Sequence, residues 1–242
     1  MKKFEYELID STNEEAKRKI LAGESGDFII IANGQTKGKG RKGREFYSPV
    51  DTGIYMSYVN VNNKPVEEVV KVTCATAVIV RNAIKEVYDK ECGIKWVNDL
   101  YYEGRKVCGI LCECILPDAE RNSTGIIVGI GINISTSEYP EEIANKAGSL
   151  GADKESNKKK ELIDCVSEGL RNFFCNPEGF EFIEEYCKHS VCIGREVVLS
   201  DASGSEIQGK ITGFTDEGYL ILEKDNSEMS VISSGEISVI YK

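Results

Sequence analysis

The pattern of apolar runs and turn residues changes near His189, and this change constrains the fold more than any other feature of the sequence. Before it, strand-like apolar runs alternate with longer stretches that carry a helical apolar stripe. After it, five short strand-like runs are separated by turn residues. The first pattern indicates a sheet covered by helices, and the second indicates a small barrel. We therefore predict an α/β or α+β domain over residues 1–189 and a small all-β module over residues 190–242.

Hydrophobic periodicity and turn residues place the expected elements within this outline. A short helix is expected between Ser11 and Gly23, and Asn33 with Gly34 is expected to open a turn. Residues 135–157 are polar, contain glycine and are expected to form a loop. The expected strands are 4–8, 28–32, 54–61, 94–97 and 125–134, with a hairpin at 100–115; the expected helices are 65–88, 159–175 and 179–187; the strands of the module are 197–199, 207–214, 219–223, 229–232 and 237–241.

The composition excludes several classes of protein. Hydrophobic residues make up 41% of the 242 residues, which is ordinary for a folded soluble chain, and no apolar run is long enough to span a membrane. The N-terminus lacks the apolar segment of a secretory signal, and the nine cysteines are an odd number, so we predict free thiols in the cytoplasm. Three of them, Cys108, Cys112 and Cys114, would spread over roughly 20 Å of strand, too far to share one metal ion. The only histidine, His189, has no partner in view, which argues against a His-dependent catalytic triad.

The strongest functional signal is a cationic, glycine-rich stretch at residues 37–44, which we call the cationic loop. It holds five lysines and arginines with three glycines among them, and the next acid is Glu45. Glycine lets a backbone approach a ligand closely, and arginine offers forked donors that match phosphate and carboxylate oxygens. The net charge of the chain is −10, which argues against a broad surface for polyanions and makes this local cluster more informative.

The glycine spacing of the cationic loop also fits the dinucleotide fingerprint, an interpretation that we reject. That fingerprint needs a helix to begin in the loop, and Pro49 disfavours helix just before it. The Walker phosphate-binding spacing fails as well, since only three residues separate Gly34 from Gly38. Composition alone leaves a solvated loop, a small nucleic-acid patch and a ligand site open.

Two further segments favour a ligand site. Lys95 lies in a predicted buried strand beside Trp96, and such a lysine needs an anionic partner because burying an unpaired charge is costly. An ordinary salt bridge is the structural alternative. The glycines of Gly129-Ile130-Gly131 alternate along another strand and leave room for a ligand ring or a backbone to approach.

Taken in order, the motifs of the chain resemble those of biotin–protein ligases. Each motif is weak by itself, but the ordered set is specific and covers nearly the whole chain. The matching segments are Ser11-Thr12-Asn13; Gln35 followed by residues 38–44; Lys95-Trp96-Val97-Asn98-Asp99; residues 105–113; Gly129-Ile130-Gly131-Ile132-Asn133; and residues 234–238.

The resemblance implies a fold and a reaction. The fold would be α+β, a central mixed sheet flanked by helices as in class II synthetases, with a C-terminal SH3-like β-barrel. The enzyme would join biotin to ATP, giving biotinyl-5′-AMP and pyrophosphate. It would then transfer biotin to a lysine of a biotin carboxyl carrier domain of a carboxylase. Holding two anions together requires fixed positive charge but no enzyme nucleophile, which agrees with the absence of a His-based site. Mg²⁺ is expected with ATP, although the sequence does not identify its ligands.

The resemblance also assigns roles to individual residues. Lys95 would contact the carboxylate and α-phosphate oxygens and is, together with Arg41, the predicted catalytic residue. The predicted biotin-binding residues are Ser11, Thr12, Asn13, Gln35, Lys39, Gly40, Arg41 and Lys95, and the predicted nucleotide-binding residues are Arg44, Phe46 and Asn133.

Two positions depart from the pattern of the family. Lys39 stands where arginine is usual, so the charge is kept while the forked geometry is lost. Val97 stands where proline is usual, so the backbone is less restrained before Asn98. Because the first strand begins by Phe4, we expect no N-terminal helix-turn-helix domain, no sequence-specific DNA binding and no repressor activity. The oligomeric state is left open, a homodimer included.

Two alternatives come from different classes of protein. A lipoate–protein ligase would share the fold and the adenylation chemistry, but the Arg-Arg-x-Ser-Gly-Gly-Gly loop of that family is missing. A non-enzymatic nucleic-acid-binding module would use the cationic loop alone. The acidic remainder of the chain and the strand-embedded Lys95 argue against it.

Overall fold

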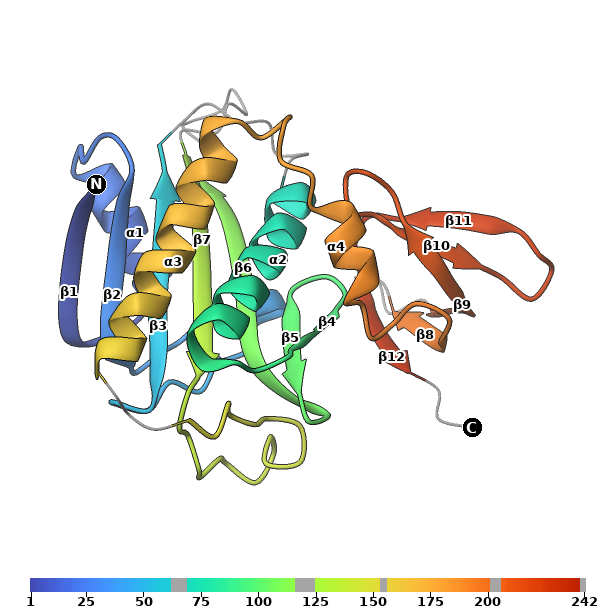
Figure 1. The fold of residues 1–242 in the computed structure, drawn as a ribbon, viewed down its shortest axis with the longest axis horizontal. Helices are drawn as coiled ribbons and strands as arrows, with labels where there is room; N and C mark the ends of the chain where they lie inside the picture. The colour runs from blue at the N-terminus through green and yellow to red at the C-terminus, as the bar shows by residue number, and fades with distance from the viewer. Residues whose placement is uncertain (62–68, 116–124, 153–155, 201–205, 240–242) are drawn as a thin grey trace.

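The computed structural model of the protein describes residues 1–61, 69–115, 125–152, 156–200 and 206–239. In this part of the chain, a seven-stranded mixed sheet carries helices on both faces, and a five-stranded antiparallel sheet lies beside it (Figure 1). The predicted α+β architecture with a separate all-β part is therefore confirmed. None of the described helices is long and apolar enough to cross a membrane.

The central sheet has the strand order β1-β2-β3-β7-β6-β5-β4. The pair β1–β2 is parallel, and every other neighbouring pair is antiparallel. Its middle strand, β7, is covered on both edges and is almost entirely buried, as its run of apolar residues predicts. The strands are β1 (Lys2–Ile9), β2 (Phe28–Gln35), β3 (Gly53–Asn60), β4 (Gly93–Lys95), β5 (Asp99–Tyr102), β6 (Arg105–Ile115) and β7 (Gly125–Asn133).

Alternating side chains of the sheet pack against different helices. Along β2, Ile29 belongs to the large core cluster under α2 and α3, whereas Phe28 and Ile30 belong to a smaller cluster with Ala16 of α1. This alternation follows from the two-residue period of a strand. The helices are α1 (Thr12–Leu21), α2 (Val69–Tyr88), α3 (Ser156–Cys175) and α4 (Ile183–Lys188).

The last five strands form an antiparallel sheet with the order β11-β10-β9-β8-β12, which we call the C-terminal sheet. This is the small all-β module that we predicted; within the described residues no pairing joins β11 to β12, so the five strands form an open sheet and not a closed barrel. The domain boundary at residues 189 and 190 stays a prediction. The strands are β8 (Glu196–Ser200), β9 (Glu206–Phe214), β10 (Leu220–Glu223), β11 (Met229–Ile232) and β12 (Glu236–Val239).

The predicted turn at Asn33 and Gly34 is wrong. Strand β2 continues to Gln35 because β1 pairs with it in register up to that residue. Gly34 is needed there for packing, since a Cβ would lie 2.7 Å from a methyl group of Val50. Glycine in a strand can therefore mark close packing instead of a turn.

Two further boundaries differ from the prediction. Strand β4 ends at Lys95, and the following residues, 96–98, form the turn of a hairpin with a cis peptide bond between Trp96 and Val97. Helix α4 begins at Ile183 and not near Gly179, because the Gly179 amide bonds to a side chain in a turn and Phe180 packs on α3. The expected helix start at Pro65 and the last residues of the final strand lie outside the described residues.

Thiol reactivity tests this packing. Cys175 is exposed at the end of α3, whereas Cys92 is buried and burial raises the pKa of its thiol to about 12. At pH 8 the Cys92 thiolate fraction is then about one in ten thousand. We expect iodoacetamide to alkylate Cys175 first in the native protein, as measured by peptide mass spectrometry. Equal rates at Cys92 and Cys175, without urea, would contradict the described burial.

Candidate functional site

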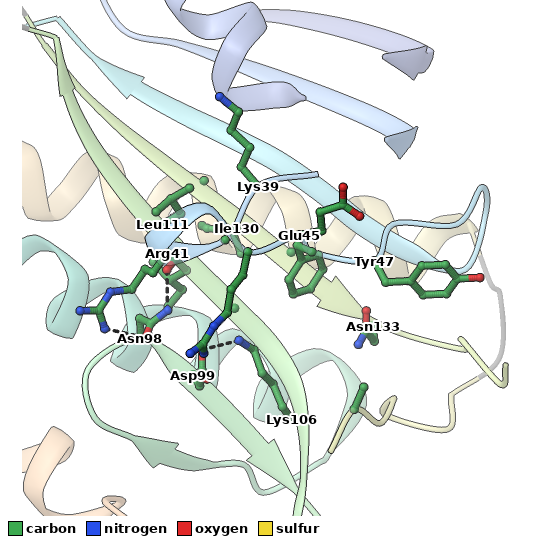
Figure 2. A pocket seen from close by; sticks show the side chains of 18 of the residues that line it. Lys39, Arg41, Glu45, Tyr47, Asn98, Asp99, Lys106, Leu111, Ile130 and Asn133 are labelled. Atoms are coloured by element: carbon green, nitrogen blue, oxygen red, sulfur yellow. Dashed lines mark hydrogen bonds and ion pairs between the residues drawn. The ribbon is translucent and has the colours of Figure 1, made fainter. Parts of the chain in front are cut away.

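All eleven residues to which the sequence assigned a role line a single cavity of about 480 Å³. Its walls come from the N-terminus of α1, the cationic loop, and strands β5, β6 and β7 (Figure 2). The C-terminal sheet closes one side through Gly235 and Ile237. The volume is in the range of sites that hold small molecules and cofactors.

One wall is built from buried polar groups at the start of α1. The backbone N–H and the hydroxyl of Thr12 both donate to Gln35 Oε1, at 2.8 and 3.1 Å. The amide nitrogen of Gln35 in turn donates to Ser48 Oγ at 2.9 Å. The start of α1 is thereby tied to β2 and to the segment that leaves the cationic loop.

Asn13 is held by protein partners at each of its polar atoms. Its Nδ2 donates to Glu113 Oε2 at 2.7 Å and to the Leu111 carbonyl at 3.3 Å, and its Oδ1 accepts from Ser57 Oγ at 2.6 Å. The side chain lies directly on Gly129, where a Cβ would come within 2.3 Å of Asn13 Oδ1. Asn13 is therefore a rigid part of the cavity wall.

From the sequence we expected the alternating glycines of β7 to leave room for a ligand ring or a backbone. In the structure, side chains of the protein itself fill this room. Asn13 occupies the space above Gly129, and the Phe46 ring occupies the space above Gly131, where a Cβ would lie 2.3 Å from the ring. The glycines instead let two distant segments rest on the strand. The ligand space is the cavity that these side chains border.

The cationic loop is a tight hairpin. The Gly40 amide donates to the Arg44 carbonyl at 2.8 Å, and the Phe46 amide donates to the Gly38 carbonyl at 2.9 Å. Gly38 has to be glycine, since a Cβ would lie 2.3 Å from the Phe46 carbonyl oxygen. The backbone then turns through left-handed conformations at residues 42 and 43.

Arg41 is oriented by neutral acceptors. Its Nη1 donates to Asn98 Oδ1 at 3.2 Å (Figure 2). Its Nη2 reaches the Gly235 carbonyl at 3.5 Å. These bonds fix the guanidinium between the hairpin that follows β4 and the C-terminal sheet without neutralising its charge. An arginine held in this way can still bind an anion.

Lys95 is half-buried at the end of β4, with its Nζ 5.6 Å from the centre of the Tyr101 ring. The described residues contain no ion pair of Lys95 with a carboxylate. The ordinary salt bridge that we gave as the structural alternative is therefore not formed in this part of the chain. By contrast, Lys106 on the same cavity pairs with Asp99 at 2.6 Å.

Lys39 points away from the other cations of the cavity (Figure 2). Its Nζ lies 2.7 Å from Glu14 Oε1 on α1, and the same oxygen also binds Lys17 at 2.8 Å. Lys17, followed by Lys39, lowers the pKa of the Glu14 carboxyl. The lysine that stands at position 39 in place of the usual arginine is therefore already paired with a carboxylate of the protein itself.

Comparison with known proteins agrees with this geometry. Residues 5–133 match the Biotin/lipoate A/B protein ligase family, and residues 192–239 match the Biotin protein ligase C terminal domain. The chain belongs to the biotin/lipoate protein ligase family. The second match falls on the C-terminal sheet, so both parts of the molecule have counterparts in one family.

Individual relatives of this family member extend over most of its length. The bifunctional ligase/repressor BirA of Bacillus subtilis is 27% identical over 237 residues, which are 95% of this chain and 71% of the relative. The biotin–[acetyl-CoA-carboxylase] ligase of Mycobacterium tuberculosis is 26% identical over 94% of this chain and 85% of its own length. The structure of a biotin protein ligase from Aquifex aeolicus with biotin and ATP is 27% identical, with a TM-score of 0.80, and covers 100% of this chain and 99% of its own.

Several residues of the ligase-family cavity had no role in the sequence-based prediction. Asn98 and Asp99 belong to a recognised motif, but only the folded hairpin shows that they orient Arg41 and Lys106. Gly235, in the loop before β12, also lies in a matched segment that carried no assigned role. Tyr139 comes from the irregular segment after β7, where no periodicity or short motif indicated a link to the cavity.

Replacing Gly129 with alanine tests the contact that shapes the wall. The new Cβ would press on Asn13, which three hydrogen bonds hold in place, so we expect unfolding to become easier by about 1–3 kcal/mol. Urea denaturation measures the change.

The control is Gly213→Ala on β9, where a Cβ meets nothing within 4 Å. It should change the free energy of unfolding by less than about 0.5 kcal/mol. In an Asn13→Ala background, Gly129→Ala should cost less than it does in the parent, because the pressing atoms are gone. Equal effects at residues 129 and 213 would contradict the described contact.

Proposed function

We propose that the protein is a biotin–protein ligase that makes biotinyl-5′-AMP from biotin and ATP and then transfers biotin to a protein lysine. The observation that carries the proposal is the convergence of Arg41 and Lys95, neither neutralised by a carboxylate of the described residues, on one 480 Å³ cavity with a rigid polar wall. The similarity to the Aquifex aeolicus ligase with biotin and ATP supports it.

The first step joins two anions. An oxygen of the biotin carboxylate attacks the α-phosphorus of ATP, the bond from that phosphorus to the bridging oxygen breaks, and pyrophosphate leaves with the electron pair. Mutual repulsion opposes the approach, so fixed positive charge at the meeting point accelerates it. Lys95 and Arg41 would supply that charge, and no residue of the enzyme needs to form a covalent bond.

The biotin ring system would lie against the polar wall. Ser11, Thr12, Asn13 and Gln35 form that wall, and their own hydrogen bonds hold it in place before the ligand arrives. Since Asn13 has protein partners at each polar atom, we propose that it contributes shape more than new hydrogen bonds. Gly40 would then lie nearest the carboxylate, and Lys39 would have to leave Glu14 to reach it.

The nucleotide would occupy the opposite end, beside Arg44, Phe46 and Asn133. The Phe46 ring occupies the space above Gly131, where an added Cβ would lie 2.3 Å from it, and it offers an aromatic border for a base. Asn133 donates through Nδ2 to the Gly148 carbonyl at 2.9 Å, whereas its buried Oδ1 has no hydrogen-bond partner among the described residues. A buried acceptor of this kind suits the exocyclic amine of adenine.

Magnesium is expected to arrive with ATP. The described residues contain no group of three or more His, Cys, Asp or Glu side chains that could hold a metal ion, and Asp99 is engaged by Lys106. We therefore propose that phosphate oxygens and water supply most of its ligands, as is common for Mg²⁺.

The second step needs access for a protein. The neutral amine of an acceptor lysine attacks the carbonyl carbon of the mixed anhydride, AMP leaves, and the amine loses a proton. We propose a biotin carboxyl carrier domain as acceptor and the cationic loop as the segment that closes over the intermediate and limits hydrolysis. Absence of repressor activity and a cytoplasmic location stay predictions.

Pyrophosphate exchange tests the proposed activity. Labelled pyrophosphate should enter ATP when biotin is present and should not enter with lipoate or without an acid. Exchange with lipoate alone would identify a lipoate ligase instead. A folded protein that shows no acid-dependent exchange would remove the proposal and leave the cationic loop as a candidate nucleic-acid contact.

Substituting Lys95 with alanine tests the catalytic assignment. We expect the kcat of exchange to fall by about 10²-fold or more, because a charge that acts on the transition state is lost. Lys90→Ala is a matched control, since Lys90 is also half-buried and lies 5.2 Å from the centre of a tyrosine ring but does not line the cavity. Similar rates for the two variants would take Lys95 out of the catalytic role.

A further inference from the structure

The segment that presents Lys95 is held by the C-terminal sheet. The next residue, Trp96, is buried, and its indole Nε1 donates to the carbonyl oxygen of Gly218 at 2.9 Å. Gly218 lies in the turn between β9 and β10, 122 residues further along the chain. The bond is buried, where a hydrogen bond fixes geometry more strongly than it does in water.

Other contacts hold the same short segment from the same side. The Tyr186 hydroxyl on α4 donates to the Val97 carbonyl at 3.3 Å, and its ring packs edge-on against Phe214 of β9 at 5.0 Å. The backbone of Ile94 bonds to His189 and Val191, which lead from α4 toward the C-terminal sheet. Strand β4 has only three residues; it pairs with β5, and Asn98 bonds to Ile110 of β6. The contacts from α4 and the C-terminal sheet are a second support for the same short segment.

The backbone conformation and the surroundings of Gly218 both require glycine at this position. Its φ of +84° favours glycine, and an added Cβ would lie 2.6 Å from the sulfur of Cys74 on α2. The Cys74 thiol also approaches the Gly218 carbonyl, at 3.8 Å. The turn therefore fits closely between α2 and Trp96, and its carbonyl points at the indole.

We infer that the β9–β10 turn is a positioning element for Lys95, acting through the Gly218 carbonyl on Trp96. This inference rests on the proposed adenylation activity. Gly218 and Tyr186 do not line the cavity, whereas Trp96 does. The effect of Gly218 on the reaction passes through the Trp96 indole and the backbone that carries the lysine, so the C-terminal sheet contributes to catalysis by holding a residue of the central sheet in place.

Trp96→Phe removes the indole donor and keeps an aromatic ring. We expect the kcat of biotin-dependent pyrophosphate exchange to fall about tenfold while the KM for biotin changes less than about twofold, because misplacing a catalytic charge slows chemistry more than binding. Tyr186→Phe, which loses only the hydroxyl on Val97, should lower kcat about threefold. It serves as the second variant if Trp96→Phe does not fold.

Tyr58→Phe is the structural control. The Tyr58 hydroxyl is also buried and bonds to Asp27 at 2.9 Å, but this residue is outside the cavity. It should lower resistance to urea as Tyr186→Phe does and leave kcat unchanged. A loss of stability without a loss of kcat in both the Trp96 and Tyr186 variants would overturn the inference.

A double-mutant cycle asks whether Trp96 acts through Lys95. The probe is a non-hydrolysable biotinyl-sulfamoyl-adenosine, whose Kd is measured by calorimetry. We expect Trp96→Phe to weaken binding about fivefold in the parent and less than about twofold in a Lys95→Ala background. Equal losses in the two backgrounds would overturn the route through Lys95. A parent protein without biotin-dependent exchange would instead refute the proposed function, and this inference with it.

Discussion

The close contact of Asn13 with Gly129 is the constraint on which the cavity depends. Strand β7 lies in the middle of the central sheet, and its two missing Cβ atoms let Asn13 and Phe46 rest directly on the backbone. The start of α1 and the end of the cationic loop are thereby brought to the same strand. Hydrogen bonds from Ser57 and to Glu113 then hold Asn13 at this depth. A larger residue at position 129 would push one wall away from the other.

The second constraint is how positive charge is held before a ligand binds. Lys39 and Lys106 are each paired with a carboxylate, whereas Arg41 is oriented by two neutral oxygens. Lys95 has a tyrosine ring beside it and no carboxylate partner in the described part of the chain. The cavity thus contains two kinds of cation: Lys39 and Lys106 are neutralised by carboxylates of the protein, whereas the charges of Arg41 and Lys95 are not. Orientation by neutral acceptors keeps the field of Arg41 available without rearrangement at the moment of reaction.

The two sheets are coupled through the short hairpin after β4. Asn98 ties this hairpin to Ile110 of β6, and a second set of contacts comes from the turn between β9 and β10, from Tyr186 and from the backbone that follows α4. The C-terminal sheet also supplies Gly235 to Arg41. Both predicted catalytic side chains are therefore fixed, directly or through a neighbour, by residues about 120 to 190 positions away in the sequence.

The sequence by itself determined the two-part architecture, most strands and helices, and the eleven residues that meet in the cavity, because periodicity and ordered motifs are local signals. It misplaced the turn at Gly34 and assigned the glycines of β7 to the approach of a ligand ring or a backbone, since a glycine looks the same whether a ligand, a turn or a packed side chain requires it. Only the tertiary structure decided that Asn13 and Phe46 fill those spaces, that the C-terminal sheet is open within the described residues, and that Gly218 supports Trp96. The physical reason is that such contacts join segments far apart in the chain, and their partners are selected by how whole sheets and helices pack.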